Sequence, residues 1–169
     1  MKPTRLPSLK LEEFNRVPLT PGERDWWSVV PSSPGWYLVE TNAPTSVLEK
    51  LVPRSDCKKH YNFFRRASAT DLLRQYSEII LPPSRGRMYV VYSGEGRDLK
   101  ARAREHTHGN GGTGCLGLSG YATLMKYRWS FLYRTCEAHV PGSNGDKLLR
   151  TLLEQRWRGE HGWPLLCTQ

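Results

Sequence analysis

Residues 87–106 read RMYVVYSGEGRDLKARAREH, and two glycines in the middle divide this stretch into two patterns. Before them, the aromatic and β-branched residues of Arg87–Ser93 are typical of a strand that is buried on both faces. After the Gly94–Gly96 turn, Arg97–His106 is predicted to be a helix. The stretch therefore predicts a strand, a turn and a helix in direct succession.

Two further strands are predicted on either side of this unit. Gly35–Thr41 (GWYLVET) is short, aromatic and β-branched, and Pro34 and Asn42 bound it. In Tyr127–Arg134, aromatic residues alternate with other residues, and Leu132 alone breaks the alternation. Both patterns are typical of strands.

The remaining sequence predicts helices, a loop and an arm within a single domain, residues 1–169. Helices are expected over Ala43–Val52, Thr70–Ile80 and Gly145–Gly159. The glycine-rich segment His108–Gly120 is predicted to be a loop. The six prolines of residues 1–34 indicate an extended N-terminal arm with one short turn or helix at Pro21–Trp27.

The charge of the chain indicates a polyanionic partner. Its 169 residues include 25 Lys and Arg against 16 Asp and Glu, so the formal net charge is +9 and the isoelectric point is about 9.6. Clustered basic side chains release counterions from a phosphate backbone, which favours nucleic acid. A basic surface that is merely solvated is the alternative.

The cysteine pattern and the hydropathy indicate a cytoplasmic protein. The four cysteines are widely spaced and form no C-x-x-C pair, which suits a reducing compartment. No segment approaches the roughly 18 apolar residues of a membrane helix, and residues 1–14 contain no apolar targeting segment. We therefore expect no membrane association, and the oligomeric state stays open.

Two tripeptides and three single residues form a recognisable series along the chain. The first predicted strand begins Gly35-Trp36-Tyr37, and the second is followed by Gly94 in Tyr92-Ser93-Gly94. Arg102 lies ten residues after Tyr92, and His106 follows one helical turn later on the same face. Glu154 belongs to the late helix, in LLEQRW. This series resembles the GIY-YIG nucleases over residues 35–41 and 87–167.

The resemblance implies a fold and a set of roles. It implies an α/β fold with a small, mainly antiparallel central sheet flanked by helices. Glu154 would hold Mg²⁺, for which Mn²⁺ can substitute, and Arg102 would clamp the phosphate. Tyr37 or Tyr92 would orient or deprotonate the attacking water, and His106 would relay a proton or contact phosphate. The implied activity is metal-dependent endonuclease cleavage of DNA, with duplex DNA favoured as the partner.

The sequence departs from the family pattern in three places. Fifty-four residues separate Tyr37 from Tyr92 where many members have a short hairpin, so residues 42–85 are expected to be an insertion looping out of the sheet. The late asparagine of many members is vacant here, or its role passes to Gln169. Glu95 stands where the excision-repair branch of the family has lysine.

Basic residues in two segments are candidates for nucleic-acid contact. In the insertion, basic side chains interleave with aromatic ones, which suits phosphate contact with base stacking; a packed basic helix edge is the alternative. Others lie on the helix that carries Arg102. The candidates are Lys58, Lys59, Arg65, Arg66, Arg97, Lys100 and Arg104.

Other interpretations of the same residues stay open. Glu154 lies four residues from both Arg150 and Arg158, so a surface ion pair is the ordinary alternative to a metal ligand. Arg102 could pair with Asp98, and His106 could be a solvated helix residue. For the whole chain, the alternatives are a non-catalytic nucleic-acid-binding module on the same scaffold and an RNA-directed nuclease.

Overall fold

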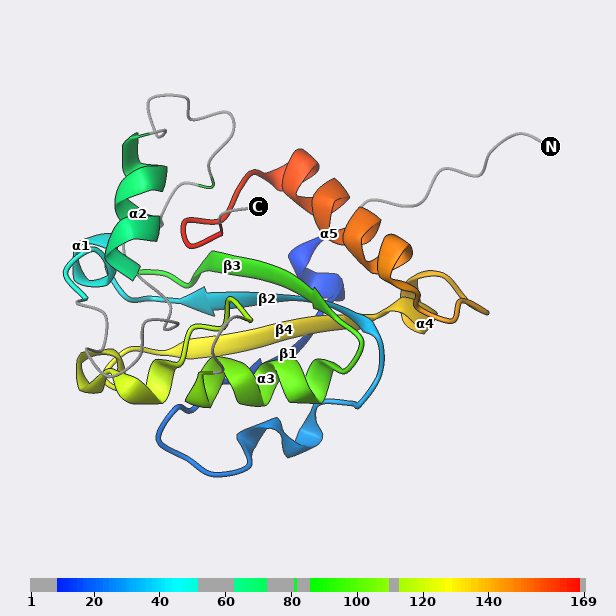
Figure 1. Ribbon diagram of the computed structural model, residues 1–169, viewed down its shortest axis with the longest axis horizontal. Coiled ribbons are helices and arrows are strands. Elements are labelled where there is room, and N and C mark those ends of the chain that lie inside the picture. The colour runs from blue at the N-terminus through cyan, green and yellow to red at the C-terminus, as the bar shows by residue number, and fades with distance from the viewer. Residues whose placement is uncertain (1–8, 52–62, 73–80, 82–85, 110–112, 168–169) are drawn as a thin grey trace.

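A computed structural model describes residues 9–51, 63–72, 81, 86–109 and 113–167 of the protein. Its centre is a four-stranded antiparallel sheet in the order β1-β4-β2-β3 (Figure 1). The strands are β1 (Asn15–Pro18), β2 (Gly35–Thr41), β3 (Tyr89–Gly96) and β4 (Trp129–Thr135). The α/β fold with an antiparallel sheet flanked by helices, as predicted, is confirmed.

Strand β2 is the centre of the sheet and is buried along its whole length. It pairs with β3 on one side and with β4 on the other, so both of its edges are hydrogen-bonded. Its apolar residues alternate between two cores, with Trp36 and Leu38 in one and Tyr37 and Val39 in the other. A strand covered on both faces needs a nearly continuous apolar sequence, which GWYLVET provides.

Two helices cover the two faces of the sheet, as Figure 1 shows. Helix α3 (Leu99–His108) packs through Leu99 and Ala103 into the core that contains Tyr37. Helix α5 (Lys147–His161) packs through Leu153 and Trp157 into the core that contains Trp36. We call these sides the α3 face and the α5 face. Side chains of neighbouring strand residues therefore point to different helices.

The N-terminal arm contributes a strand that the sequence did not predict. Strand β1 pairs with β4 over four residues, and Arg16 of β1 forms an ion pair with the buried carboxylate of Glu40 on β2. The expected short helix of the arm is present as the 3₁₀ turn η2 (Trp26–Val29), and a second 3₁₀ turn, η1, spans Leu11–Glu13. The indole of Trp26 donates to Thr107 Oγ1 of α3 at 2.8 Å and anchors the arm to the α3 face.

The helices of the insertion differ from the prediction. The helix expected over Ala43–Val52 is reduced to α1 (Thr45–Leu48). Helix α2 spans Phe63–Leu72, so it begins seven residues before the expected helix at Thr70–Ile80, whose residues 73–80 lie outside the described part of the chain. Phe63 packs against Tyr121 with ring centroids 5.2 Å apart, so the first residue of α2 is buried against a segment distant in sequence.

The remaining elements lie in the second half of the chain. The predicted loop at 108–120 contains a 3₁₀ turn, η4 (Leu118–Gly120), and η5 (Ala122–Leu124) follows it. Helix α4 (Cys136–His139) follows β4 directly. After α5, the segment Pro164–Cys167 lies along β3, where Leu166 N donates to Val91 O at 2.8 Å. Within the described residues, every helix is too short or too polar to cross a membrane.

Candidate active site

Three glycines of the motif region allow close approaches that a side chain would prevent. A Cβ at Gly94 would fall under 3.0 Å from the hydroxyl of Tyr37, and one at Gly96 would meet the Arg102 side chain at 2.5 Å. A Cβ at Gly35 would fall under 3.0 Å from the backbone oxygen of Arg134. These glycines are therefore required by packing, because each lies against the backbone or against a side chain of the site.

The hydroxyl of Tyr37 is the point on which the α3 face converges. Arg102 donates to it from Nε at 3.2 Å and from Nη2 at 3.1 Å. The Nε2 atom of His106 lies 3.0 Å from the same oxygen. The motif residues Tyr37, Arg102 and His106, which span 70 residues of sequence, thus form one hydrogen-bonded cluster.

Aromatic rings pack the cluster from both sides. The rings of Tyr37 and Tyr92 stack with centroids 6.3 Å apart, and Phe131 stacks on Tyr37 at 4.9 Å. His106 meets the rings of Tyr37 and Tyr92 edge-on at 5.2 and 4.9 Å. Tyr37 and His106 have no exposed surface, whereas Tyr92 is partly exposed. The interpretation of His106 as a solvated helix residue is therefore wrong.

Arg102 uses its remaining hydrogen bonds on the protein as well. Its Nη1 donates to Glu105 Oε2 at 2.6 Å, and its Nη2 donates to the backbone oxygen of Thr113 at 3.0 Å. Asp98, the partner expected from sequence, instead caps α3 by accepting from Ala101 N. The guanidinium is therefore held by Tyr37, Glu105 and Thr113.

The glycine-rich loop covers the cluster and determines how His106 is protonated. Leu116 N donates to His106 Nδ1 at 3.3 Å, so a neutral His106 carries its proton on Nε2 and donates it to Tyr37. Cys115 Sγ lies 3.3 Å from Glu105 Oε2, and Gly114, at φ +72°, lies against the hydroxyl of Tyr92. Three N–H groups consequently face the Tyr37 hydroxyl.

Burial controls the protonation of this cluster. It raises the pKa of Tyr37 well above its ordinary value, an effect that Arg102 partly offsets. It also raises the pKa of Tyr92. Burial, and then the charge of Arg102, lowers the pKa of His106 well below its ordinary value. At neutral pH the two tyrosines are therefore phenols and His106 is a neutral imidazole.

Glu154 lies on the other face of the sheet. Its Oε1 accepts from Ser93 Oγ at 3.1 Å and forms a buried ion pair with Arg158. Glu154 is 6% exposed and Arg158 is 5% exposed, so the surface ion pair expected from sequence is in fact a buried one. Ser93 follows Tyr92 in β3 and points to the α5 face, so Glu154 and the Tyr37 cluster approach the same strand from opposite faces. Electrostatic interaction nevertheless connects the two faces, because the charge of Glu154 contributes to raising the pKa of Tyr92.

The surroundings of Glu154 are rich in paired charges. Arg150 donates to Glu95 Oε2 at 2.5 Å. Glu95, which stands where the excision-repair branch of the GIY-YIG nucleases has lysine, therefore forms an ion pair with Arg150. Near the expected asparagine position, Cys167 Sγ accepts from Ser93 N at 3.1 Å. Gln169, the other candidate for that role, lies outside the described residues.

The donor set at Glu154 fits a hard divalent cation in chemistry. Mg²⁺ prefers oxygen ligands and is commonly held by one or two carboxylates with waters, and here the carboxylate lies beside the Ser93 hydroxyl. In the described part of the chain, no three His, Cys, Asp or Glu side chains group into a metal centre. Burial raises the pKa of Glu154, while Arg158 and Ser93 act in the opposite direction. A cation would thus depend on Glu154, whose charge Arg158 already neutralises.

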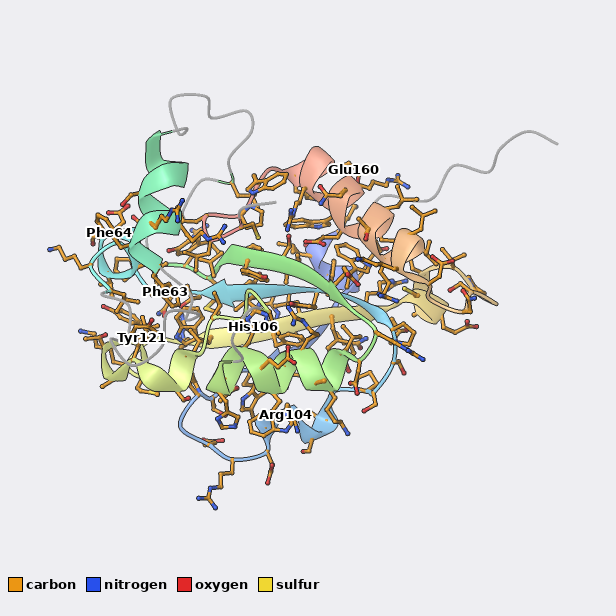
Figure 2. The ribbon with its side chains drawn as sticks, viewed as in Figure 1. Phe63, Phe64, Arg104, His106, Tyr121 and Glu160 are labelled. Atoms are coloured by element: carbon orange, nitrogen blue, oxygen red, sulfur yellow. The ribbon has the colours of Figure 1, made fainter. Side chains whose placement is uncertain are left out.

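Of the basic residues expected to contact nucleic acid, those that the structure describes are not among the side chains hydrogen-bonded to Tyr37. Arg104 is exposed on α3, Arg97 is exposed just before the helix begins, and Lys100 on α3 is half-buried. Arg104 points away from the sheet, on the side of α3 opposite to His106 (Figure 2). Of the candidates in the insertion, Arg65 is exposed and Arg66 half-buried on α2, and Lys58 and Lys59 lie outside the described residues.

Several residues that hold the site were not selected from sequence. Glu105 and Thr113 hold Arg102, while Ser93 and Arg158 hold Glu154. Glu105 could have been found from its spacing, because it lies three residues after Arg102 on the same helix face. Thr113 acts through its backbone oxygen, so its side chain gives no signal.

No family model matches the sequence, and neither a curated protein nor a solved structure shows significant similarity to the chain. The function is therefore inferred from the geometry of the site and from the motifs.

Proposed function

We propose that the protein is an endonuclease that hydrolyses phosphodiester bonds of DNA. The observation that carries the proposal is the convergence of Arg102 and His106 on the hydroxyl of Tyr37, with Tyr92 stacked beside it. Residues of two strands and a helix meet there in the combination that the GIY-YIG resemblance implies. The net charge of +9 supports a nucleic-acid substrate.

The proposal gives each residue of the cluster a role that follows from its exposure. Arg102 has a partly exposed side chain, 19% of its surface, and its planar fork suits the oxygens of a phosphate. Tyr92 is also partly exposed and would orient the attacking water. Tyr37 and His106 are fully buried, so they act as positioning residues that hold the guanidinium. Among the described residues, four of the five N–H groups of Arg102 have acceptors, which leaves the second Nη1–H to donate to a phosphate.

A divalent cation is part of this proposal. When bound at Glu154, it would neutralise charge that develops on the phosphate and on the leaving oxygen. The chain's own contribution there is to hold the Glu154 carboxylate through Ser93 and Arg158.

A second candidate function is a non-catalytic nucleic-acid-binding module. It is favoured by one observation, that Arg102 donates to three protein groups and Glu154 is paired with Arg158. On this interpretation the Tyr37 cluster is a polar part of the protein core, and the exposed basic residues bind the phosphate backbone of the nucleic acid.

The test is incubation of the protein with supercoiled plasmid, single-stranded DNA and RNA, each with Mg²⁺ or with a chelator. We expect nicked or linear plasmid with Mg²⁺ and intact plasmid with the chelator. Arg24→Ala is the matched control, because Arg24 is an exposed arginine far from the motifs in sequence. Binding without cleavage of any substrate would favour the binding module, and cleavage of RNA alone would replace DNA as the substrate.

A further inference from the structure

Arg158 is fixed more tightly than an ordinary helical ion pair requires. Besides its ion pair with Glu154, its Nε donates to Ser93 Oγ at 2.7 Å and its Nη2 to Ser93 O at 3.3 Å. Its guanidinium lies over the ring of Trp163, 4.3 Å from the centroid. Three residues from β3, α5 and the following segment therefore hold this side chain in place.

Charge balance along α5 shows why this arginine and not its neighbour serves Glu154. Arg150, Glu154 and Arg158 follow one another at four-residue spacing and lie on one face of the helix. Arg150 has its own carboxylate, Glu95, and also donates to Gly145 O at 2.5 Å. Arg158 is thus the cation that neutralises Glu154.

We propose that Arg158 is the resident counter-cation of Glu154 and that it sets the affinity of this position for a divalent cation. The proposal rests on the proposed function, which assigns the cation to Glu154. The single negative charge of Glu154 is already balanced by the positive charge of Arg158. A divalent cation placed beside the intact, buried pair would therefore be repelled by the Arg158 guanidinium. Arg158 must release Glu154 before the ion gains a full carboxylate partner, and this lowers the measured affinity.

The test measures Mn²⁺ binding directly, from the loss of the electron paramagnetic resonance signal of free Mn²⁺. We expect Arg158→Gln to bind Mn²⁺ at least about tenfold more tightly than the natural chain, because the competing charge is gone. The double variant Glu154→Gln, Arg158→Gln should lose this binding. Arg156→Gln is the matched control, since Arg156 lies on the same helix but pairs with the exposed Glu160, and its affinity should equal that of the natural chain.

A second measurement uses the unaltered protein, in case Arg158→Gln does not fold. The Nε–H resonance of Arg158, assigned by its absence in Arg158→Lys, should shift in ¹⁵N spectra over the same Mg²⁺ concentrations that saturate the protein. Equal or weaker Mn²⁺ binding by folded Arg158→Gln, or an unmoved Arg158 resonance, overturns the proposal. Cleavage of nucleic acid is measured separately from Mn²⁺ binding. If the Arg158 proposal fails, the proposed nuclease function is unaffected. If the protein cuts no nucleic acid, the nuclease function is refuted whatever the Mn²⁺ affinity.

Discussion

The two faces of the sheet hold their charged groups in different ways. On the α3 face, Arg102 is held by a hydroxyl, a backbone oxygen and the partly exposed Glu105, and a fifth of its side chain reaches solvent. On the α5 face, Glu154 and Arg158 pair directly and are almost completely buried. A ligand can therefore compete for Arg102 at the surface, whereas a ligand of Glu154 must first displace Arg158 from a buried pair. The comparison predicts that substitutions on the α3 face change activity first and those on the α5 face change stability first.

The largest effect is expected from breaking the buried pair. Glu154→Gln leaves Arg158 charged and without its carboxylate, which should lower the free energy of unfolding by about 3–5 kcal/mol. Replacing both residues, as Glu154→Leu with Arg158→Met, should recover most of that loss because no buried charge remains. Urea denaturation measures both variants, with Glu160→Gln as the exposed control at under about 1 kcal/mol. A stable Glu154→Gln protein would show that the pair is not structural.

The matching experiment on the α3 face is Arg102→Ala. If Arg102 stabilises the phosphate, single-turnover cleavage of a short duplex should slow by a factor of about 10²–10³. Arg102→Lys should not restore the rate, because lysine lacks the planar fork. Cleavage within about threefold of the natural rate would remove Arg102 from the proposed active site and weaken the contrast between the faces.

A smaller effect is expected where the α3 face depends on a glycine. Gly94→Ala should lower the free energy of unfolding by about 1–3 kcal/mol, because the new methyl group overlaps the hydroxyl of Tyr37. Tyr37→Phe in the same chain should reduce that penalty only in part, because the ring carbon Cζ would still lie 2.6 Å from the new methyl group, and a double-mutant cycle by urea denaturation measures the coupling. Gly22→Ala is the control, since its Cβ would meet no atom within 4 Å. Additive losses would contradict the contact.

The smallest effect is the acid dependence that His106 introduces. Its pKa is well below the ordinary 6.5 in the folded protein, so below about pH 6.5 the unfolded chain takes up a proton that the folded chain does not. Stability should therefore fall as the pH falls from 6.5, by at most about 1.4 kcal/mol per pH unit. His106→Gln should flatten the plot of unfolding free energy against pH between 5 and 6.5. His139, whose pKa burial also lowers, gives the corresponding comparison near the α5 face, and an unchanged slope in His106→Gln would contradict the burial argument.

The sequence predicted the central strands well and the edges less well. The strands at Gly35–Thr41 and Tyr127–Arg134 carry their own alternation or apolar runs, so local pattern was sufficient. Strand β1 was missed because it has four mostly exposed residues, includes Pro18, and is stabilised by pairing with β4 and by the Arg16–Glu40 ion pair. Helix α2 begins at Phe63, earlier than predicted, and Phe63 packs against Tyr121, a contact that local periodicity does not reveal.

The candidate site was predictable in its members but not in its geometry. Motif spacing selected Tyr37, Tyr92, Arg102 and His106, and the structure brings these four together. Four-residue spacing also indicated a pair between Glu154 and Arg158, but spacing contains no information on burial. Whether that pair lies at the surface or in the interior depends on β3 and on the segment after α5, which are distant in sequence.

Both edges of the sheet are protected against further strand pairing. At one edge, β1 is short and ends at Pro18, which has no N–H to donate. At the other edge, Val91 O and Ser93 N of β3 are already bonded to Leu166 and Cys167. A peptide or a second copy of the chain therefore finds these backbone groups of β3 occupied and cannot extend the sheet by β-augmentation there. At this stretch of β3, a macromolecule therefore contacts side chains rather than the strand backbone, and the same closure reduces edge-to-edge pairing there.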